Sequence, residues 1–396
     1  MKHRIVVLGA GYAGAFTAGY LARQLHTADV EITVVNAAPD FVERLRLHQL
    51  AAGHDLPHRP LTEIFAGTGI ELRVARVTGV DVDRRTVTIT DDVGTDRLGY
   101  DTLLYTLGST VAEHGVPGVA EHAFHVAARQ SALRLRARLD ELTEDGQVLV
   151  VGGNLTAIET ATEIAEARPG LRVGLATSGE LGGWLGPKAR AHLRRAFDRF
   201  GITVHEHTEI ARVEQHGAVA VDGTVLAADA TVWAAGFAVG PIAAASALAV
   251  EPDGRITVDR QMRSISHPEV YVAGDSVFVL GENGLPLPMS CASAGFTGAQ
   301  AAAAIIGDLT GRKIKATKLS YVGNHVSLGR EDGIFQLVDG RARAKSGALR
   351  GRPAARVKAA IVATSAWAIS RPTFGRPNHR YRLATDRAVS PRVVPA

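Results

Sequence analysis

The 396-residue chain contains a single cysteine, Cys291, so no disulfide can form within it. One cysteine also excludes a CxxC redox pair and a thiolate metal cluster, and we expect no metal site. A reducing, cytoplasmic setting is favoured. Cys291 itself is more typical of a small packing residue than of a functional thiol.

Long apolar segments and aromatic residues are also scarce. No apolar run approaches the ~18–20 residues that a membrane-spanning helix needs, and the longest late candidate covers only residues 359–369. The first apolar run enters a glycine turn at once, unlike a signal peptide. Aromatics make up 5% of the chain, whereas alanine, valine and glycine are abundant. This composition favours α/β sheets packed closely by helices, in two or three domains.

Charge is divided unevenly along the chain. Residues 311–396 hold 18 Lys/Arg against 4 Asp/Glu, a net charge of +14, and the remaining 26 and 36 leave −10 for residues 1–310. A basic tail suits an anionic surface. We expect no nucleic-acid partner, because the tail lacks interleaved aromatics and any nucleic-acid motif. At most a weak attachment to an anionic membrane surface, at its inner face, is predicted.

A dinucleotide-binding motif opens the chain. Residues 4–8 form an apolar strand, "GAGYAG" supplies Gly9, Gly11 and Gly14, and a helix is predicted to about Gln24, before a second strand over 30–36. In GxGxxG the first glycine makes the tight turn, the second admits a pyrophosphate, and the third lets the helix pack on the strand. Asn36 ends the second strand where an acid is usual, and we expect it to contact a ribose hydroxyl.

The pattern restarts in "VLVVGGNLTAIETATEIAE", residues 148–166. Gly152 occupies the first glycine position, while Asn154 and Ala157 replace the second and third. This unit is either a second nucleotide site or a damaged copy. Asparagine tolerates the left-handed conformation better than most residues, so the turn is expected to survive. Residues 71–90 alternate and predict antiparallel strands, and a last helix is predicted near 354–369, within an otherwise irregular basic end.

Five segments, "VVLGAGYAG", "YDTLLYTLGS", "VVGGNLTAIETATEIAE", "VWAAGF" and "HPEVYVAGDSV", occur in the order of the FAD-dependent pyridine nucleotide-disulfide oxidoreductases. The chain most resembles their type II NADH dehydrogenase-like and apoptosis-inducing-factor-like group. The resemblance implies an α/β, glutathione-reductase-like fold of two Rossmann-like domains, the second inserted in the first. It predicts an FAD-binding domain over 1–112 and 238–316, an NAD(P)-binding-like domain over 113–237, and a basic C-terminal region over 317–396.

The same resemblance implies FAD at the first glycine motif and NADH or NADPH at the second. Asp275 matches the acid that holds the ribityl and phosphate part of FAD. Thr177 and Ser178 stand where an acid would select NADH, so neither nucleotide is preferred. The expected cofactor-binding residues, beyond those named for the two motifs, are Tyr12, Ala13, Arg44, Val77, Gly108 and Gly274.

Three residues are predicted to be catalytic. Glu159 matches a family glutamate that faces the flavin and nicotinamide, and Arg46 and His48 lie in a segment that passes the flavin. The glutamines that line the family's quinone pocket are missing, which argues against quinone itself and leaves the acceptor open between a quinone-like molecule and another small oxidant. One alternative is a flavin oxidase or dehydrogenase that tailors an organic substrate without a working NAD(P)H site. Another is a flavin-holding redox sensor or scaffold, and a homodimer stays open as the assembly.

Overall fold

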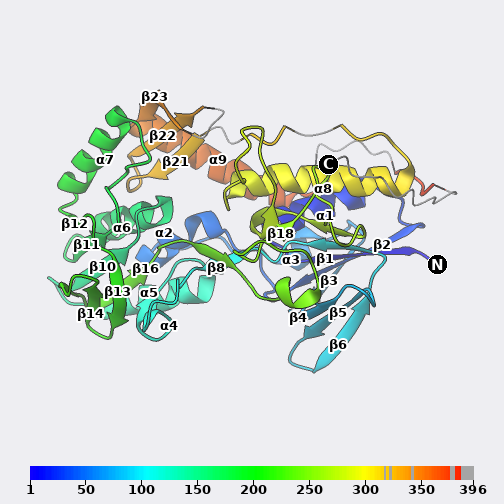
Figure 1. Cartoon of the computed structure of the whole chain (residues 1–396), viewed down its shortest axis with the longest axis horizontal. Helices are drawn as coiled ribbons and strands as arrows, with labels where there is room; N and C mark the ends of the chain where they lie inside the picture. Colours follow the sequence, from blue (N-terminus) through cyan, green and yellow to red (C-terminus); the bar gives the residue numbers. More distant parts are fainter. Residues whose placement is uncertain (316–317, 321–322, 340–342, 375–379, 385–396) are drawn as a thin grey trace.

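A computed structural model describes residues 1–315, 318–320, 323–339, 343–374 and 380–384. Its first sheet has the order β19–β7–β1–β2–β3, and all neighbouring strands are parallel (Figure 1). Continuous β-branched and leucine runs suit strands that are covered on both faces. The strands are β1 (His3–Leu8), β2 (Val30–Asn36), β3 (Ile70–Val74), β7 (Thr102–Tyr105) and β19 (Val270–Val272).

Two helices pack side by side on this sheet. They are α1 (Tyr12–Gln24), which ends where the sequence predicted, and α8 (Cys291–Thr310), which begins after a Ser290 side-chain cap. Beside the sheet lie antiparallel β4 (Arg76–Asp81), β5 (Thr86–Thr90) and β6 (Thr95–Gly99). The prediction of antiparallel strands from residue 71 was wrong for β3, which pairs in parallel with β2. Alternation cannot distinguish the two arrangements, because side chains alternate faces in both.

A second parallel sheet has the order β12–β11–β10–β16–β9, with an antiparallel β13–β14–β15 sheet beside it. Helices α5 (Arg129–Glu141), α6 (Leu155–Ala167) and α7 (Pro187–Arg199) belong to this half. The prediction of two Rossmann-like parallel sheets is confirmed. The strands are β9 (Ala123–Phe124), β10 (Gln147–Val151), β11 (Arg172–Ala176), β12 (Thr203–His205), β13 (Ile210–Glu214), β14 (Gly217–Ala220), β15 (Val225–Ala227) and β16 (Ala230–Trp233).

The two halves are joined by a pair of antiparallel strands, β8 (Ser109–Val111) and β17 (Phe237–Val239). The chain leaves the first sheet after β7 through β8, and returns through β17 before it adds β19 to that sheet. The domain boundaries given above stay predictions. The short elements are η1 (Arg44–Arg46), α2 (Leu47–Ala52), α3 (Leu61–Ile64), α4 (Val119–His122), η2 (Ala244–Ser246), β18 (Ile256–Thr257), η3 (Gly274–Ser276) and β20 (Val277–Phe278).

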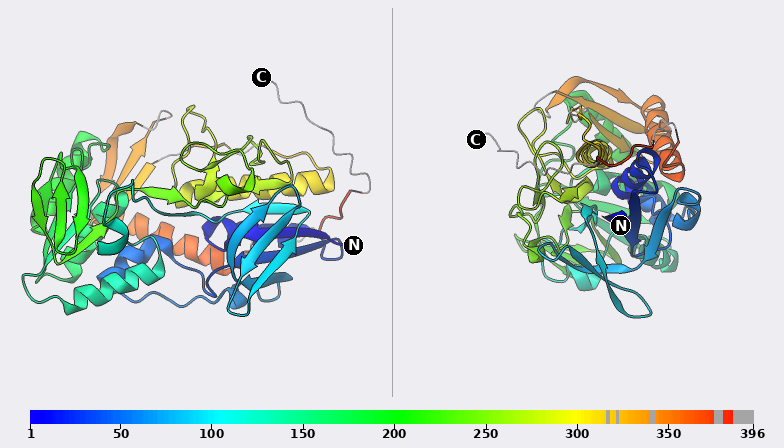
Figure 2. Two further views of the ribbon diagram at one scale, coloured as in Figure 1. Left: turned by 60° about the horizontal axis from the view of Figure 1, so that its bottom comes forward. Right: turned by 90° about the vertical axis from the view of Figure 1, so that its right-hand side faces the viewer.

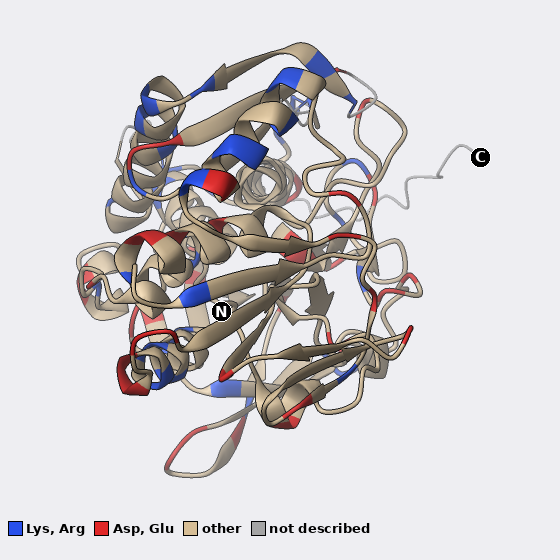
Figure 3. Cartoon of the chain, turned by 90° about the vertical axis from the view of Figure 1, so that its left-hand side faces the viewer, with Lys and Arg blue, Asp and Glu red and all other residues tan. Residues whose placement is uncertain are grey.

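The C-terminal region forms an antiparallel sheet and a long helix. Strands β21 (Gly323–Ser327), β22 (Gly333–Val338) and β23 (Ala344–Arg350) precede α9 (Arg352–Ser370), which reaches from this sheet to α1 (Figure 2). The helix matches the predicted one, but β23 was not predicted. Lys and Arg outnumber Asp and Glu on the elements at the top of Figure 3. Among the described residues, none of the helices combines the length and apolarity needed to cross a bilayer.

Candidate active site

Two positions of the first glycine turn, between β1 and α1, have no room for a side chain. Gly9 has φ +92°, and a Cβ there would lie 2.6 Å from the Thr106 carbonyl oxygen. A Cβ on Gly14 would lie 1.9 Å from the Gly9 carbonyl oxygen, so α1 could not pack against the turn. Both glycines are therefore required by the protein itself.

Gly11 differs, because the space around it is open. No atom lies within 4 Å of the position a Cβ would take, and Gly11 is the N-cap of α1 without a side-chain bond to the helix. The free N–H groups at the helix start thus face open space, which is the arrangement that binds phosphate. Gly108, with φ +72°, also has nothing within 4 Å of a Cβ. These positions fit a bound dinucleotide whose pyrophosphate lies at the start of α1.

A polar cluster from three distant segments lies at the edge of the first sheet. Ser109 Oγ donates a 2.6 Å hydrogen bond to Asp275 Oδ2. The Arg44 guanidinium donates to the Ser109 carbonyl oxygen at 2.7 Å and lies 3.6 Å from the same Asp275 oxygen. The remaining carboxylate oxygen can accept hydroxyl hydrogen bonds from a ligand. The structure thus brings together Arg44 and Asp275, which were both predicted to bind FAD, with Ser109.

Other predicted FAD-site residues support the backbone. Asn36 Oδ1 accepts from the Ala10 N–H at 2.9 Å and its Nδ2 donates to the Ala38 carbonyl oxygen at 2.7 Å, so its amide holds the glycine turn. The ribose contact of Asn36 stays a prediction.

Tyr12, Ala13, Gly274 and Val77 are packed around this turn and its neighbours. Tyr12 stacks edge-on against Phe41, with ring centres 5.1 Å apart. Gly274, at φ +80°, comes so close to Ala13 that a Cβ would lie 3.2 Å from the Ala13 methyl. Val77 is buried and pairs with Ile89 in β4–β5.

The second glycine turn keeps its shape by different means. Gly152 has φ +139°, and a Cβ there would meet the Ala234 carbonyl oxygen at 2.4 Å. The turn survives, as expected, but Asn154 is extended, with φ −89°, and does not use the left-handed conformation that asparagine tolerates. Its Oδ1 accepts from the Ala157 N–H at 3.1 Å and its Nδ2 donates to the Ala234 carbonyl oxygen at 2.8 Å. The side chain is turned into the protein and caps α6, and one N–H of the helix start is already used.

An open hollow lies in front of this turn. Its lining residues are Gly153, Asn154, Leu155, Trp184 and Asn324, and its volume is about 410 Å³. The Trp184 Nε1–H donates to the Gly153 carbonyl oxygen at 3.1 Å, which fixes one wall. Nothing in the sequence pattern singled out Trp184 or Asn324, because one lies in a loop and the other comes from the C-terminal sheet.

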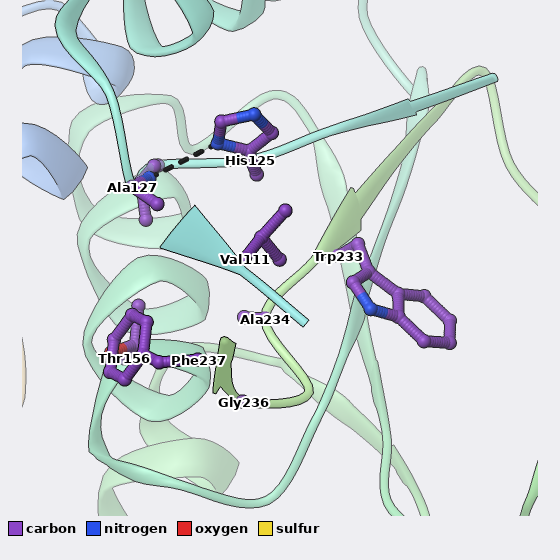
Figure 4. Close-up of a pocket in the computed structure, with 9 residues that line it drawn as sticks. Val111, His125, Ala127, Thr156, Trp233, Ala234, Gly236 and Phe237 are labelled. Atoms are coloured by element: carbon purple, nitrogen blue, oxygen red, sulfur yellow. Dashed lines mark hydrogen bonds between the residues drawn. The ribbon is translucent and has the colours of Figure 1, made fainter. Parts of the chain in front are cut away.

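Arg44 and Phe237 form a contact between the first sheet's polar cluster and the strand pair that joins the two halves. The Arg44 guanidinium lies over the Phe237 ring, 4.9 Å from its centre, while it also contacts Asp275. Phe237 and Thr156 line one small cavity, with His125 on another wall bonded to the Ala127 N–H at 3.2 Å (Figure 4). Arg44 therefore connects Asp275 to Phe237, which lines a cavity together with Thr156 of the second glycine unit.

Glu159 lies on α6 and is 7% exposed. Its Oε1 accepts from Lys358 Nζ of α9 at 2.8 Å and from the Ser327 N–H of β21 at 2.9 Å. Burial acts to raise the pKa of Glu159, but Lys358, His48 and the bond from Ser327 outweigh it and hold the pKa below its usual value. Glu159 is thus ionised. Sequence reasoning missed Lys358 and Ser327, since no local pattern links residues so far apart.

The other two predicted catalytic residues point to different partners. Arg46 donates to Gln49 at 2.9 Å and to Glu43 at 3.3 Å. His48 is 5% exposed and lies 4.0 Å from Glu163, one turn after Glu159 on α6. Burial lowers the pKa of His48 to about 4. His48 is therefore neutral near pH 7, and any catalytic role of Arg46, His48 and Glu159 stays a prediction.

These two sheets and their glycine turns define a two-nucleotide oxidoreductase fold. The family model for the pyridine nucleotide-disulphide oxidoreductases matches residues 3–304. The chain belongs to this family, and it is an oxidoreductase, as the sequence predicted.

Relatives and solved structures share the architecture. The chain is 28% identical to an NADH dehydrogenase-like protein of Mycobacterium tuberculosis, over 84% of this chain and 87% of that protein. It is 26% identical to the type II NADH:quinone oxidoreductase of Staphylococcus aureus, over 91% and 93%. The sulfide:quinone oxidoreductase structure from Aquifex aeolicus superposes with a TM-score of 0.77 and 20% identity, covering 99% of this chain and all of that one. The similarity to the Aquifex aeolicus structure shows a shared fold and nothing more.

Proposed function

We propose that the protein passes electrons from NADH or NADPH through FAD to a quinone-like or other small acceptor. The observation that carries the proposal is Arg44, which touches both Asp275 and Phe237. A flavin held by Asp275 would then lie beside the wall of the second nucleotide unit. Similarity to NADH dehydrogenase-like and NADH:quinone oxidoreductase proteins supports the same pair of substrates.

The residues of the chain have separable tasks. Bound FAD supplies two-electron chemistry, and the protein supplies position and electrostatics. The start of α1 at Gly11 would hold the pyrophosphate, and Asp275 would accept bonds from ribityl hydroxyls. The Arg44 guanidinium places positive charge at this edge of the first sheet. Lys358 holds Glu159 ionised and fixed in direction.

One observation favours the alternative of a flavin enzyme without an NAD(P)H site. Asn154 already uses the Ala157 N–H, so the second unit offers fewer donors to a pyrophosphate than the first. The open hollow beside it still leaves room for a nucleotide. We therefore retain NAD(P)H as the donor and expect weak binding with little preference between NADH and NADPH.

Steady-state turnover tests the proposal. Purified, FAD-loaded protein should oxidise NADH or NADPH when menadione is added, and the rate should saturate with both substrates. Gly11→Val should abolish the activity together with FAD binding. If neither nucleotide is oxidised with menadione or another two-electron acceptor, the proposal is wrong and the alternative gains support.

The cellular location of the protein can be proposed from the charge of its C-terminal region. We propose a cytoplasmic protein with at most weak, salt-sensitive attachment to the inner face of the membrane. The basic C-terminal region supports this, since Lys and Arg can interact with anionic lipid. The homodimer stays a prediction that gel filtration with light scattering can test.

A further inference from the structure

A buried group of titratable side chains lies behind Glu159 and is not used by the proposed function. Its centre is Glu163, whose side chain is 1% exposed. Neither carboxylate oxygen of Glu163, nor His48 Nε2, has a hydrogen-bond partner among the described residues. A buried carboxyl without hydrogen bonds is costly, so its presence requires a reason.

Two histidines approach this carboxyl from one segment. His54 Nε2 lies 3.1 Å from Glu163 Oε1, at an angle that does not form a hydrogen bond, and its side chain is 40% exposed. His48 Nε2 lies 4.0 Å from the other oxygen, Oε2. His48 and Glu159 also influence each other's pKa, which places His48 near both glutamates. His54 is the solvent-exposed member of the group, whereas Glu163, His48 and Glu159 are all buried.

Charged side chains of both signs surround Glu163. Arg330, in the turn after β21, lies 3.9 Å from Glu163 Oε1 and is 47% exposed. Arg330 and Arg46 of η1 lower the pKa of Glu163, whereas Glu159 and Glu166 of α6 raise it. Burial is the dominant influence and raises the pKa of Glu163 to about 7. Glu163 can therefore gain and lose a proton near neutral pH, as general acid–base groups do.

We infer that His54, Glu163 and His48 form a proton relay between solvent and the Glu159–Lys358 pair, and that the relay feeds acceptor reduction. This inference rests on the proposed function. The nucleotide donates a hydride, which carries two electrons and one proton. A quinone-like acceptor takes two electrons and two protons to become a quinol, so one proton per turnover must come from water. The relay would supply that proton: His54 takes it from solvent, Glu163 and His48 pass it to the Glu159–Lys358 pair, and this pair would release it to the reduced acceptor, which completes the quinol.

The test compares two acceptors with the FAD-loaded protein. Menadione needs protons for its reduction, whereas ferricyanide takes single electrons and no protons. We expect Glu163→Gln to lower the ratio of menadione to ferricyanide turnover by about tenfold or more, as removal of a proton-transfer group does. Glu163→Asp should recover part of the ratio, and His54→Gln should lower it less. His216→Gln, which changes an exposed histidine in the turn between β13 and β14, is the matched control.

Equal loss with both acceptors, or no change in the ratio, would overturn the relay. A wild type that reduces neither acceptor refutes the proposed function instead, and a second readout then decides on the relay. Infrared titration of the oxidised protein should show the carbonyl band of a protonated carboxyl that disappears near pH 7 and is absent in Glu163→Gln. His54→Gln should shift the midpoint. Absence of this band in the wild type would show that Glu163 carries no exchangeable proton.

Discussion

At the scale of single residues, Gly11 is distinguished by what it does not touch. Gly9 and Gly14 are needed by the fold, but a side chain at Gly11 would meet no protein atom. Gly11→Val should therefore fold normally, but its side chain would occupy the space of the pyrophosphate. We expect the FAD affinity to fall at least about tenfold, which corresponds to about 1.4 kcal/mol. Flavin absorbance after gel filtration and thermal unfolding of the apoprotein measure the two effects.

Gly240→Val provides the matched control. A Cβ at Gly240 would also meet nothing within 4 Å, and Gly240 is an exposed residue directly after β17. It should keep its FAD. Equal flavin loss in both variants, or a Gly11→Val protein that stays yellow, would contradict the assignment of the α1 start to FAD.

Glu163 gives a prediction for stability. Its pKa is raised from 4.5 to about 7 by burial, so below pH 4.5 the group is neutral in both the folded and unfolded states. Between pH 4.5 and 7 the unfolded state is ionised while the folded state still holds its proton, so the folded state loses relative stability until the pH passes 7. The free energy of unfolding of wild type, relative to Glu163→Gln, should fall by about 3 kcal/mol between pH 4.5 and 8. Urea titrations measure it, and a difference that rises with pH would contradict the burial argument.

The sequence predicted the residues that obey a local rule and missed those that depend on distant contacts. The strand, glycines and helix of the first motif lie within one segment, so α1 was predicted to the correct end. Asn154 was expected to keep the turn, but the way in which it does so was not predicted. Its side chain bonds to Ala234 and to the start of α6 while its backbone is extended. Lys358 could not be assigned to Glu159 because only the packing of α9 brings them together.

At the scale of elements, the start of α6 determines how well a nucleotide binds. Asn154→Gly should release the Ala157 N–H and tighten NADH binding severalfold, while stability changes by only a few tenths of a kcal/mol. Asn154→Asp should keep the cap but place a negative charge beside the pyrophosphate, and weaken binding by about tenfold or more. Isothermal titration of the three proteins checks this order, and three equal affinities would mean that the nucleotide does not lie at α6.

Helix α9 connects the C-terminal sheet to the site, and this explains why deletion is a poor probe of the basic region. Removing the helix also removes Lys358, which is bonded to Glu159. Its far end carries an exposed aromatic pair, Trp367 and Phe374, with ring centres 4.9 Å apart, and the Arg371 guanidinium lies over the Trp367 ring. Substitution of these residues leaves the site intact.

At the scale of the whole molecule, the +14 of residues 311–396 predicts weak binding to anionic vesicles at low salt. High salt should release the protein, because screening weakens exposed charges. The double variant Trp367→Ala, Phe374→Ala should lower low-salt binding in a co-sedimentation assay. Binding that survives high salt would refute the electrostatic account and indicate apolar insertion of α9.

The proposed function requires the two nucleotide-binding units to face one another, so that a hydride can pass between their nucleotides. Anaerobic stopped-flow mixing of the FAD-loaded protein with NADH or NADPH, without acceptor, tests it most directly. We predict that the visible flavin absorbance bleaches in a single turnover, with a rate that saturates at high nucleotide concentration, and that menadione restores the colour. A flavin that stays oxidised with both nucleotides, although FAD is bound, would contradict the claim.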